Sequence, residues 1–150
     1  MPNCRRILRI ASAAALYLLS SYAGAGQEAV KVASLLTGTW NQVMRTEPSC
    51  ENKKYLHTFS LSADGLLLTK RYLVPYDGNY GPIAEERFRV LYASDMSLRL
   101  FREGETFEQR DTGDKVIRQL IVDSSKTYAW RVYGMPRDDR AAAGGLRCSN

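Results

Sequence analysis

The chain has 150 residues, of which 45% are hydrophobic, 25% charged and 10% aromatic, and this profile excludes a disordered chain, a collagen-like repeat, a polytopic membrane protein and a large multidomain enzyme. Its formal charge is +5, from 21 basic and 16 acidic residues, but Arg5, Arg6 and Arg9 lie within the first 25 residues, so the rest of the chain carries +2 (18 minus 16). Because the remaining charges are interleaved and form no basic run, we exclude nucleic acid as a partner.

Residues 1–25 are typical of an export signal. The three arginines precede an apolar stretch from Ile10 to Leu19, and small residues follow, so we expect cleavage after Ala25. A helix that crosses a bilayer needs about 20 apolar residues. We therefore predict no stable membrane span, with a retained anchor as the alternative. The expected product is a periplasmic or secreted protein, exported by the Sec or the twin-arginine route, with a single domain over residues 26–150.

Alternation of apolar and polar residues at period two dominates the rest of the chain and predicts an all-β fold. Before it, Gln27–Leu35 has a weak helical period and predicts one or two helical turns. Eight strands are then expected, at Leu36–Met44, Tyr55–Ser62, Leu66–Val74, Ile83–Tyr92, Ser97–Arg102, Thr106–Asp111, Lys115–Val122 and Lys126–Tyr133. Short turn-forming connections favour antiparallel neighbours. Closure hides the edges of such a meander, so we predict a single eight-stranded antiparallel up-and-down barrel.

The same alternation predicts which side chains face the interior of the barrel. The inward faces of the second, fourth and last predicted strands are Tyr55, His57, Phe59 and Leu61; Phe88, Val90 and Tyr92; and Tyr128, Trp130 and Val132. Two segments interrupt the strand pattern. Pro75–Pro82 is rich in Gly and Pro and is expected to be a loop that carries Tyr76 and Tyr80, and Gly134–Arg147 is expected to be irregular.

Two cysteines remain after removal of residues 1–25, Cys50 and Cys148. In an oxidising compartment they are expected to form a disulfide. That bond would close a loop of 98 residues (148 minus 50) and bring the two ends of the domain together. A redox or nucleophilic cysteine pair is the alternative, but the spacing is not Cys-x-x-Cys.

The segment Leu36–Trp40 opens the strand series and contains Gly38 and Trp40, which resemble the Gly-x-Trp signature of lipocalins and related calycins. Phe59–Gly65 is similar to the second strand and turn of small bacterial lipocalin-like domains. The resemblance implies a lipocalin-like barrel in which Trp40 closes the floor beneath an arginine of the last strand, a structural role that Arg131 would fill. The chain is shorter than classical lipocalins and ends in a Gly-rich tail. Secreted bacterial inhibitors of proteases and lysozymes use a similar compact barrel, so the resemblance implies a fold more than a function.

Sequence motifs for catalysis are missing. His57 is the single histidine, and its place between Tyr55 and Phe59 favours a packed histidine over a catalytic or metal-binding one. Neighbouring carboxylates such as Glu85 and Glu86 point to opposite faces of a strand and cannot act on one bond. Phosphate-binding loops and dinucleotide fingerprints do not occur. We therefore predict a non-enzymatic protein with no metal and no cofactor.

These observations favour a barrel that binds a small apolar or amphipathic molecule. The residues expected to line the ligand site are aromatic or lie among aromatics: Tyr55, His57, Phe59, Tyr72, Phe88 and Trp130. The alternative is a protein-interaction module with a solid barrel, such as an inhibitor of an extracellular hydrolase (a protease or a lysozyme), that uses Tyr76 and Tyr80 of the Pro75–Pro82 loop.

Overall fold

The structure is a computed structural model that describes residues 26–43, 49–78, 81–109, 112–134 and 143–149. The predicted export signal, residues 1–25, lies outside the described residues. The elements in chain order are a helix over residues 26–35, β1 (Thr39–Val43), the 3-10 helix η1 (Lys53–Tyr55), β2 (Leu56–Leu61), β3 (Leu67–Gly78), β4 (Gly81–Ser94), β5 (Ser97–Arg102), β6 (Ile117–Val122), β7 (Thr127–Val132) and β8 (Ala143–Ser149).

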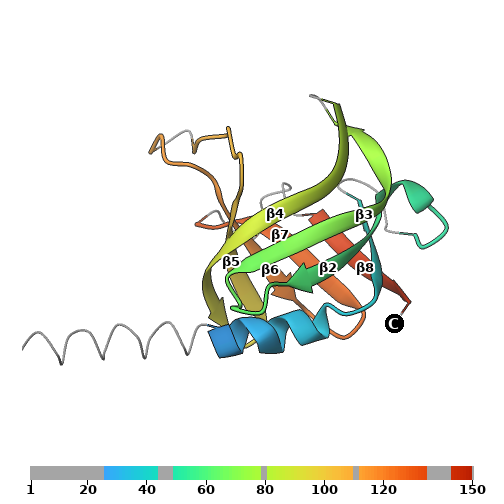
Figure 1. Cartoon of the computed structure of the whole chain (residues 1–150), viewed down its shortest axis with the longest axis horizontal. Helices are drawn as coiled ribbons and strands as arrows, with labels where there is room; N and C mark the ends of the chain where they lie inside the picture. The colour runs from blue at the N-terminus through green and yellow to red at the C-terminus, as the bar shows by residue number, and fades with distance from the viewer. Residues whose placement is uncertain (1–25, 44–48, 79–80, 110–111, 135–142, 150) are drawn as a thin grey trace, which may run out of the picture.

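The eight strands form a closed barrel in which each strand pairs antiparallel with the next. β8 pairs antiparallel with β1 and closes the sheet. Figure 1 shows this up-and-down barrel with one helix across its end. Closure leaves no free sheet edge around the barrel itself. The predicted fold, an eight-stranded antiparallel up-and-down barrel of lipocalin-like architecture, is confirmed.

The helix over residues 26–35 lies across one end of the barrel (Figure 1). Ala29 and Val32 on the helix and Leu36 directly after it are fully buried and belong to the barrel core. These positions recur every three to four residues, so they form one face of a helix. The prediction of helical turns over Gln27–Leu35 is confirmed, and the apolar face explains why the segment docks on the barrel.

Trp40 on β1 closes the barrel interior beside this helix. Its side chain is fully buried, and its indole Nε1 donates a hydrogen bond to the carbonyl oxygen of Leu36 at 2.9 Å. The guanidinium of Arg147 lies 4.7 Å from the centre of the indole ring. The expectation that Arg131 packs on Trp40 is wrong, because β7 is not the last strand and β8 supplies the arginine instead.

The disulfide between Cys50 and Cys148 is confirmed. It links the segment that follows β1 to the end of β8, next to the seam where these two strands pair. The bond therefore holds the two ends of the domain side by side, as the loop-closure argument predicts.

The last barrel strand, β8, begins within Gly134–Arg147, the segment expected to be irregular, and continues to Ser149. Ala143 and Gly145 are buried, and β8 pairs with both β1 and β7. A Cβ atom added at Gly145 would lie only 2.1 Å from the ring of Tyr128. Glycine therefore occurs in this strand because the backbone packs directly against an aromatic ring, and not because the chain turns.

The predicted strand at Thr106–Asp111 is wrong. Among its described residues, only Glu108 makes an isolated bridge, to Lys115. The neighbouring strands pair without it, since Phe101 on β5 lies opposite Ile117 on β6. Charged residues fall on both faces of the segment, so neither face can be buried in the core. Residues 103–109 and 112–116 instead belong to a connection that projects from the barrel (Figure 1).

The expected loop Pro75–Pro82 is also wrong for its described residues, because β3 and β4 continue to Gly78 and from Gly81. β2 pairs with β3 only as far as Tyr72, and β5 pairs with β4 only from Phe88 onward. Beyond these points β3 and β4 pair only with each other. Residues 73–78 and 81–84 therefore form a two-stranded arm that projects from the barrel (Figure 1).

The interior face of β4 changes at a register shift between Val90 and Tyr92. Phe88 is buried and Val90 packs against the core, as predicted, but Tyr92 is 48% exposed and Ala93 takes the buried position. The irregularity moves the following side chains to the opposite face of the sheet. The prediction that Tyr92 faces inward is wrong for this reason.

Candidate functional site

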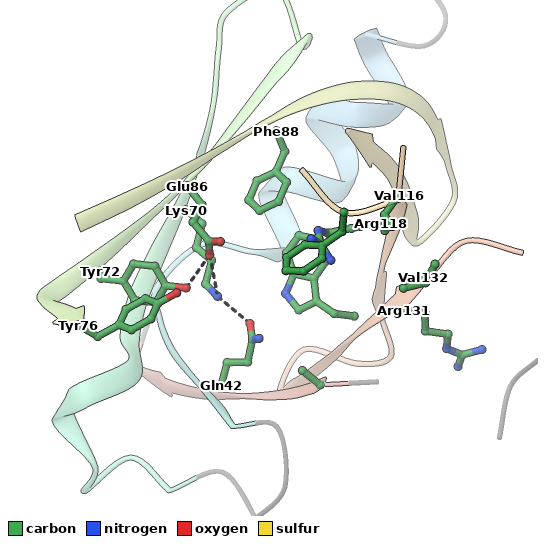
Figure 2. Close-up of a pocket in the computed structure, with 13 residues that line it drawn as sticks. Gln42, Lys70, Tyr72, Tyr76, Glu86, Phe88, Val116, Arg118, Arg131 and Val132 are labelled. Carbon is green, nitrogen blue, oxygen red and sulfur yellow. Dashed lines mark hydrogen bonds and ion pairs between the residues drawn. The ribbon is translucent and has the colours of Figure 1, made fainter. Parts of the chain in front are cut away.

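A pocket of about 590 Å³ opens into the barrel interior (Figure 2). Small-molecule sites have volumes of about 300–1,000 Å³. Tyr76 on the arm and Phe107 on the β5–β6 connection belong to segments that project at the end of the barrel opposite the helix. The side chains that line the pocket come from β1, β3, β4, β6, β7, β8 and the β5–β6 connection. They are Gln42, Lys70, Tyr72, Tyr76, Glu86, Phe88, Phe107, Val116, Arg118, Trp130, Arg131, Val132 and Ala143.

One part of the pocket wall is apolar. The rings of Phe88 and Trp130 pack with their centroids 5.2 Å apart, and Val116, Val132 and Ala143 extend the same surface. The indole N–H of Trp130 is buried and makes no hydrogen bond of standard geometry among the described residues, although it lies close enough to the hydroxyl of Tyr128 to oppose the rise in pKa that burial causes there. Buried donors are usually satisfied. This wall can therefore pack against hydrocarbon and offer one hydrogen bond to an acceptor on a ligand.

Lys70 forms the polar part of the pocket (Figure 2). The side chain is only 3% exposed, although Lys is almost never buried unless it is paired. Its Nζ lies 2.7 Å from Oε1 of Gln42 and 3.8 Å from Oε2 of Glu86, and 4.8 Å from the centre of the Tyr72 ring. The amine is thus held by an amide, a carboxylate and an aromatic face.

Glu86 joins three side chains at the polar part of the pocket. The hydroxyl of Tyr72 donates to Oε2 at 2.6 Å, and Arg102 lies 3.2 Å from Oε1. Lys70 approaches from β3, so the carboxylate has two cationic neighbours. These contacts compensate for placing a carboxylate inside the barrel.

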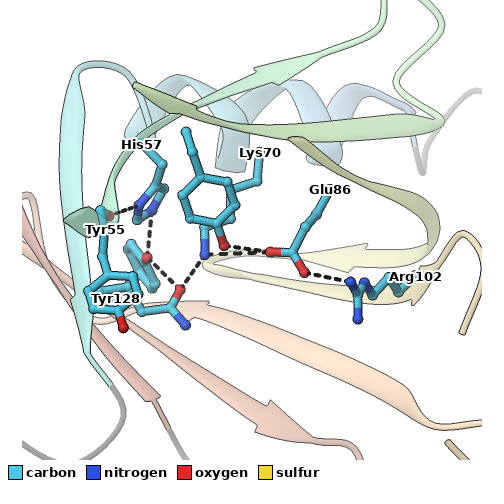
Figure 3. Close-up of polar contacts among 8 residues, drawn as sticks. Tyr55, His57, Lys70, Glu86, Arg102 and Tyr128 are labelled. Carbon is cyan, nitrogen blue, oxygen red and sulfur yellow. Dashed lines mark hydrogen bonds and ion pairs between the residues drawn. The ribbon is translucent and has the colours of Figure 1, made fainter. Parts of the chain in front are cut away.

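A second branch of the polar network continues from Gln42 behind the pocket (Figure 3). The hydroxyl of Tyr128 lies 3.0 Å from Oε1 of Gln42 and 2.8 Å from Nε2 of His57. The other ring nitrogen of His57, Nδ1, lies 2.8 Å from the carbonyl oxygen of Tyr55. Tyr128 and His57 are both buried. One chain of polar contacts therefore crosses the barrel from β2 to β5.

Burial controls the charge of this network. Desolvation, with the nearby charge of Lys70, lowers the pKa of His57 from 6.5 to about 3. Desolvation also lowers the pKa of Lys70 from 10.5 to about 8; Glu86 opposes this shift and Arg102 adds to it. Burial raises the pKa of Tyr128. At neutral pH His57 and Tyr128 are therefore uncharged, and Lys70 is far closer to losing its proton than an exposed lysine.

A buried ion pair positions the β5–β6 connection beside the pocket. Arg118 pairs with Glu105, whose side chain is fully buried. The other oxygen of this carboxylate, Oε1, accepts the backbone N–H of Phe107 at 3.1 Å. These contacts hold Phe107 as part of the pocket lining, although its side chain is 62% exposed.

Tyr72, Phe88 and Trp130, of the residues expected to contact a ligand, line the pocket. His57 and Phe59 do not line it; they pack edge to face behind its wall, with ring centroids 5.1 Å apart. Tyr55 also lies outside the lining, in η1.

The tyrosines expected to contact a protein partner lie near the arm. Tyr76 lines the pocket and packs against the rings of Tyr72 and Tyr55, with centroids 4.7 and 5.8 Å away. It therefore belongs to the pocket as much as to the outer surface of the arm. Tyr80 lies outside the described residues.

The main polar residues of the site were missed at the sequence level, although the alternation contained a signal for them. Lys70 lies two residues from both Leu68 and Tyr72, so period two places it on the inward face of β3. Glu86 is related in the same way to Phe88 on β4. We did not expect these two residues to face inward, because charged side chains are normally exposed to solvent.

His57 predicts a pH dependence of stability. Since its pKa is lowered by folding, the unfolded chain binds a proton near pH 6.5 and the folded chain only near pH 3. Stability is fully present above pH 6.5 and is lost as the pH falls from 6.5 toward 3. We expect a loss of about 1.4 kcal/mol per pH unit in the free energy of unfolding within this window, measured by urea titration at pH 7.5 and 5.5.

The matched control for this prediction is His57→Gln, which removes the only histidine of the chain. Its free energy of unfolding should change much less between the same two pH values. An equally steep dependence in the variant would contradict the assignment, because the carboxylates titrate mainly below this range.

Comparisons of the chain with other proteins add no function to this geometry. In the part of the chain that the structure describes, no helix has the length and hydropathy that a membrane span requires. Searches against protein-family models, curated proteins and solved structures found no match for this chain.

Proposed function

We propose that this protein is a periplasmic or secreted, non-enzymatic, lipocalin-like barrel that binds a small apolar or amphipathic molecule in its pocket. The observation that carries the proposal is a pocket of about 590 Å³ inside a closed barrel. Its lining combines a continuous apolar wall with a few polar groups, which is the usual composition of a small-molecule site.

The distribution of polar groups favours an amphipathic ligand. Lys70, Glu86 and Gln42 lie together at one part of the pocket, whereas Phe88 and Trp130 line another (Figure 2). A hydrocarbon chain would contact the aromatic wall, and a polar head would exchange hydrogen bonds with the charged group. Export is supported by the basic and apolar N-terminal segment and by the disulfide between Cys50 and Cys148.

A titration with 1-decanol tests the pocket. We expect saturable binding by calorimetry together with a change in tryptophan fluorescence, because Trp130 lines the pocket. Trp40, the other tryptophan, is fully buried away from it, so Trp130→Phe should remove the change in fluorescence while binding persists in calorimetry. Val132→Phe, which fills part of the pocket, should weaken binding about tenfold, which corresponds to roughly 1.4 kcal/mol.

The matched control is Leu91→Phe, which makes a similar change at a position that is 52% exposed. Decanol should bind this variant as it binds the unmodified chain. The proposal fails if the unmodified chain shows no saturable binding of decanol, or if Val132→Phe and Leu91→Phe bind it equally well.

Capture of an extracellular protein, such as a hydrolase, is the second candidate function. The projecting arm favours it, since Leu73 and Val74 on its outer part are 56% and 51% exposed. Exposed apolar residues on a projecting ribbon can contribute to a protein interface. This function does not need an open pocket, so Val132→Phe would leave protein capture intact.

A further inference from the structure

Tyr128 has one hydroxyl hydrogen and two neighbours that could receive it. They are Nε2 of His57 at 2.8 Å and the amide of Gln42 at 3.0 Å. On the far side of the imidazole, Nδ1 faces the carbonyl oxygen of Tyr55 at 2.8 Å, and a carbonyl oxygen can only accept. The Nδ1 atom must therefore carry a hydrogen.

The uncharged state of His57 decides where the Tyr128 hydrogen goes. A neutral imidazole has one N–H, which is used at Nδ1, so Nε2 has a lone pair and accepts the hydroxyl hydrogen. The oxygen of Tyr128 then accepts a hydrogen bond, and two side chains can supply the donor: the indole N–H of Trp130 and the amide of Gln42. The amide of Gln42 supplies one when it is turned by a half-rotation, which exchanges its oxygen and nitrogen positions.

The orientation of the Gln42 amide affects the protonation state of Lys70. The amide atom nearest to Tyr128 is also the atom 2.7 Å from Nζ of Lys70, and after the half-rotation it is an N–H donor. An ammonium group has no lone pair to accept this hydrogen, whereas a neutral amine has one. With the amide turned, the contacts from Tyr55 to Lys70 therefore favour a neutral amine, whereas with the amide oxygen toward Nζ they favour the ammonium form.

The charges around Lys70 leave the ammonium form predominant at pH 7 but give the neutral amine a much larger share than in an exposed lysine. Its pKa is lowered to about 8 by desolvation and by Arg102, in spite of Glu86. The other side chains that face it, Gln42 and Tyr72, carry no charge at neutral pH, and His57 is neutral. The other five lysines of the chain are all exposed. Lys70 thus differs from them in burial and in its position at a pocket.

We propose that Lys70 is a covalent attachment site for apolar aldehydes, which it binds as an imine inside the pocket. The inference rests on the proposed function, because the aldehyde must first bind in the pocket. The apolar wall would hold the hydrocarbon part, and the carbonyl carbon would approach the amine at the polar part of the same space.

The reaction is a condensation that needs no oxidant or reductant. The lone pair of Nζ attacks the carbonyl carbon and forms the C–N bond, while one amine hydrogen moves to the carbonyl oxygen. The C–O bond of this carbinolamine then breaks, and the oxygen leaves as water with the second amine hydrogen. Glu86 is the nearest carboxylate to relay these protons, and it remains as the counter-ion when the imine is protonated.

Trapping with decanal and sodium cyanoborohydride at pH 7 tests the proposal on the full chain. The hydride reduces the imine to a stable secondary amine, and peptide mapping by mass spectrometry locates the decyl group. An amine with a pKa of about 8 is neutral far more often at pH 7 than one near 10.4, on the order of a few hundredfold. We therefore expect a decyl group on Lys70, beside one on the α-amino group of the N-terminus, before the exposed lysines react.

Two lysine variants serve as a matched pair in this experiment. Lys70→Met should lose the fast-reacting site, and Lys126→Met, at an exposed position, should keep it. If Lys70→Met does not fold, the peptide map of the unmodified chain still shows whether the decyl group is on Lys70. Decyl groups on exposed lysines with Lys70 unreacted would overturn the inference. If decanol still binds in that case, the proposed function stands; if neither decanol nor decanal binds, both fail.

Tyr128→Phe tests whether the hydroxyl of Tyr128 affects the protonation of Lys70 in addition to the effect of burial. Without the hydroxyl, the Gln42 amide is free to turn its oxygen toward Lys70 and stabilise the ammonium form. We expect the pH midpoint of trapping at Lys70 to rise above that of the unmodified chain. An unchanged midpoint would show that Tyr128 does not position the amide and would contradict the coupling between Tyr128 and Lys70.

Discussion

Gly145→Ala should lower the free energy of unfolding by about 3 kcal/mol, the upper end of the usual cost of overpacking a core. The added Cβ would lie 2.1 Å from Cζ and 2.2 Å from Cε1 of the Tyr128 ring. The ring cannot easily move away, because its hydroxyl is held by His57 and its faces pack against Trp40 and Phe59. Urea unfolding followed by circular dichroism measures the effect.

The neighbouring residue provides the control. A Cβ added at Gly144 would meet no atom within 4 Å, and this position is exposed. Gly144→Ala should therefore change the free energy of unfolding by no more than about 0.5 kcal/mol. Equal effects of the two substitutions would show that the contact between Gly145 and Tyr128 does not limit the packing of β8.

Loss of the disulfide should have the largest effect on stability. Replacement of both Cys50 and Cys148 by Ser opens a loop with a sequence separation of 98 residues. The chain-entropy argument assigns about 4–5 kcal/mol to a loop of this size. Since domains have a total stability of about 5–15 kcal/mol, the double variant should unfold at a much lower urea concentration.

Reduction of the unmodified chain with dithiothreitol is the matched comparison for the double serine variant. The reduced chain and the double variant should lose a similar free energy of unfolding, because each lacks the covalent link and keeps every core side chain. An unfolding midpoint that stays the same after complete reduction would contradict the expectation. It would mean that pairing between β1 and β8 is sufficient to hold this end of the chain.

Much of the barrel was predictable because apolar side chains alternate along its strands. The predicted strand at Ser97–Arg102 has the same bounds as β5, and six more predictions overlap β1 to β4, β6 and β7. The strand Ala143–Ser149 was missed because two glycines lower its β propensity, and because the packing of Gly145 against Tyr128 is a contact between different strands. Thr106–Asp111 alternates weakly, but it has no apolar face to bury.

The candidate site was less predictable than the fold. Aromatic residues on inward faces indicated the apolar wall, and Tyr72, Phe88 and Trp130 do line the pocket. The polar network depends on pairs far apart in sequence, such as Gln42 with Tyr128, which are 86 residues apart. Such pairs depend on the register between strands of the closed barrel, and strand propensity does not predict that register.

Pairing of β8 with β1 has a consequence for the order of events during biosynthesis. The ribosome makes these strands first and last, so a nascent chain that ends before Ala143 exposes the open edges of an incomplete sheet. Such edges can pair with other chains. The barrel therefore depends on the synthesis of Ala143–Ser149 to close the sheet and cover these edges.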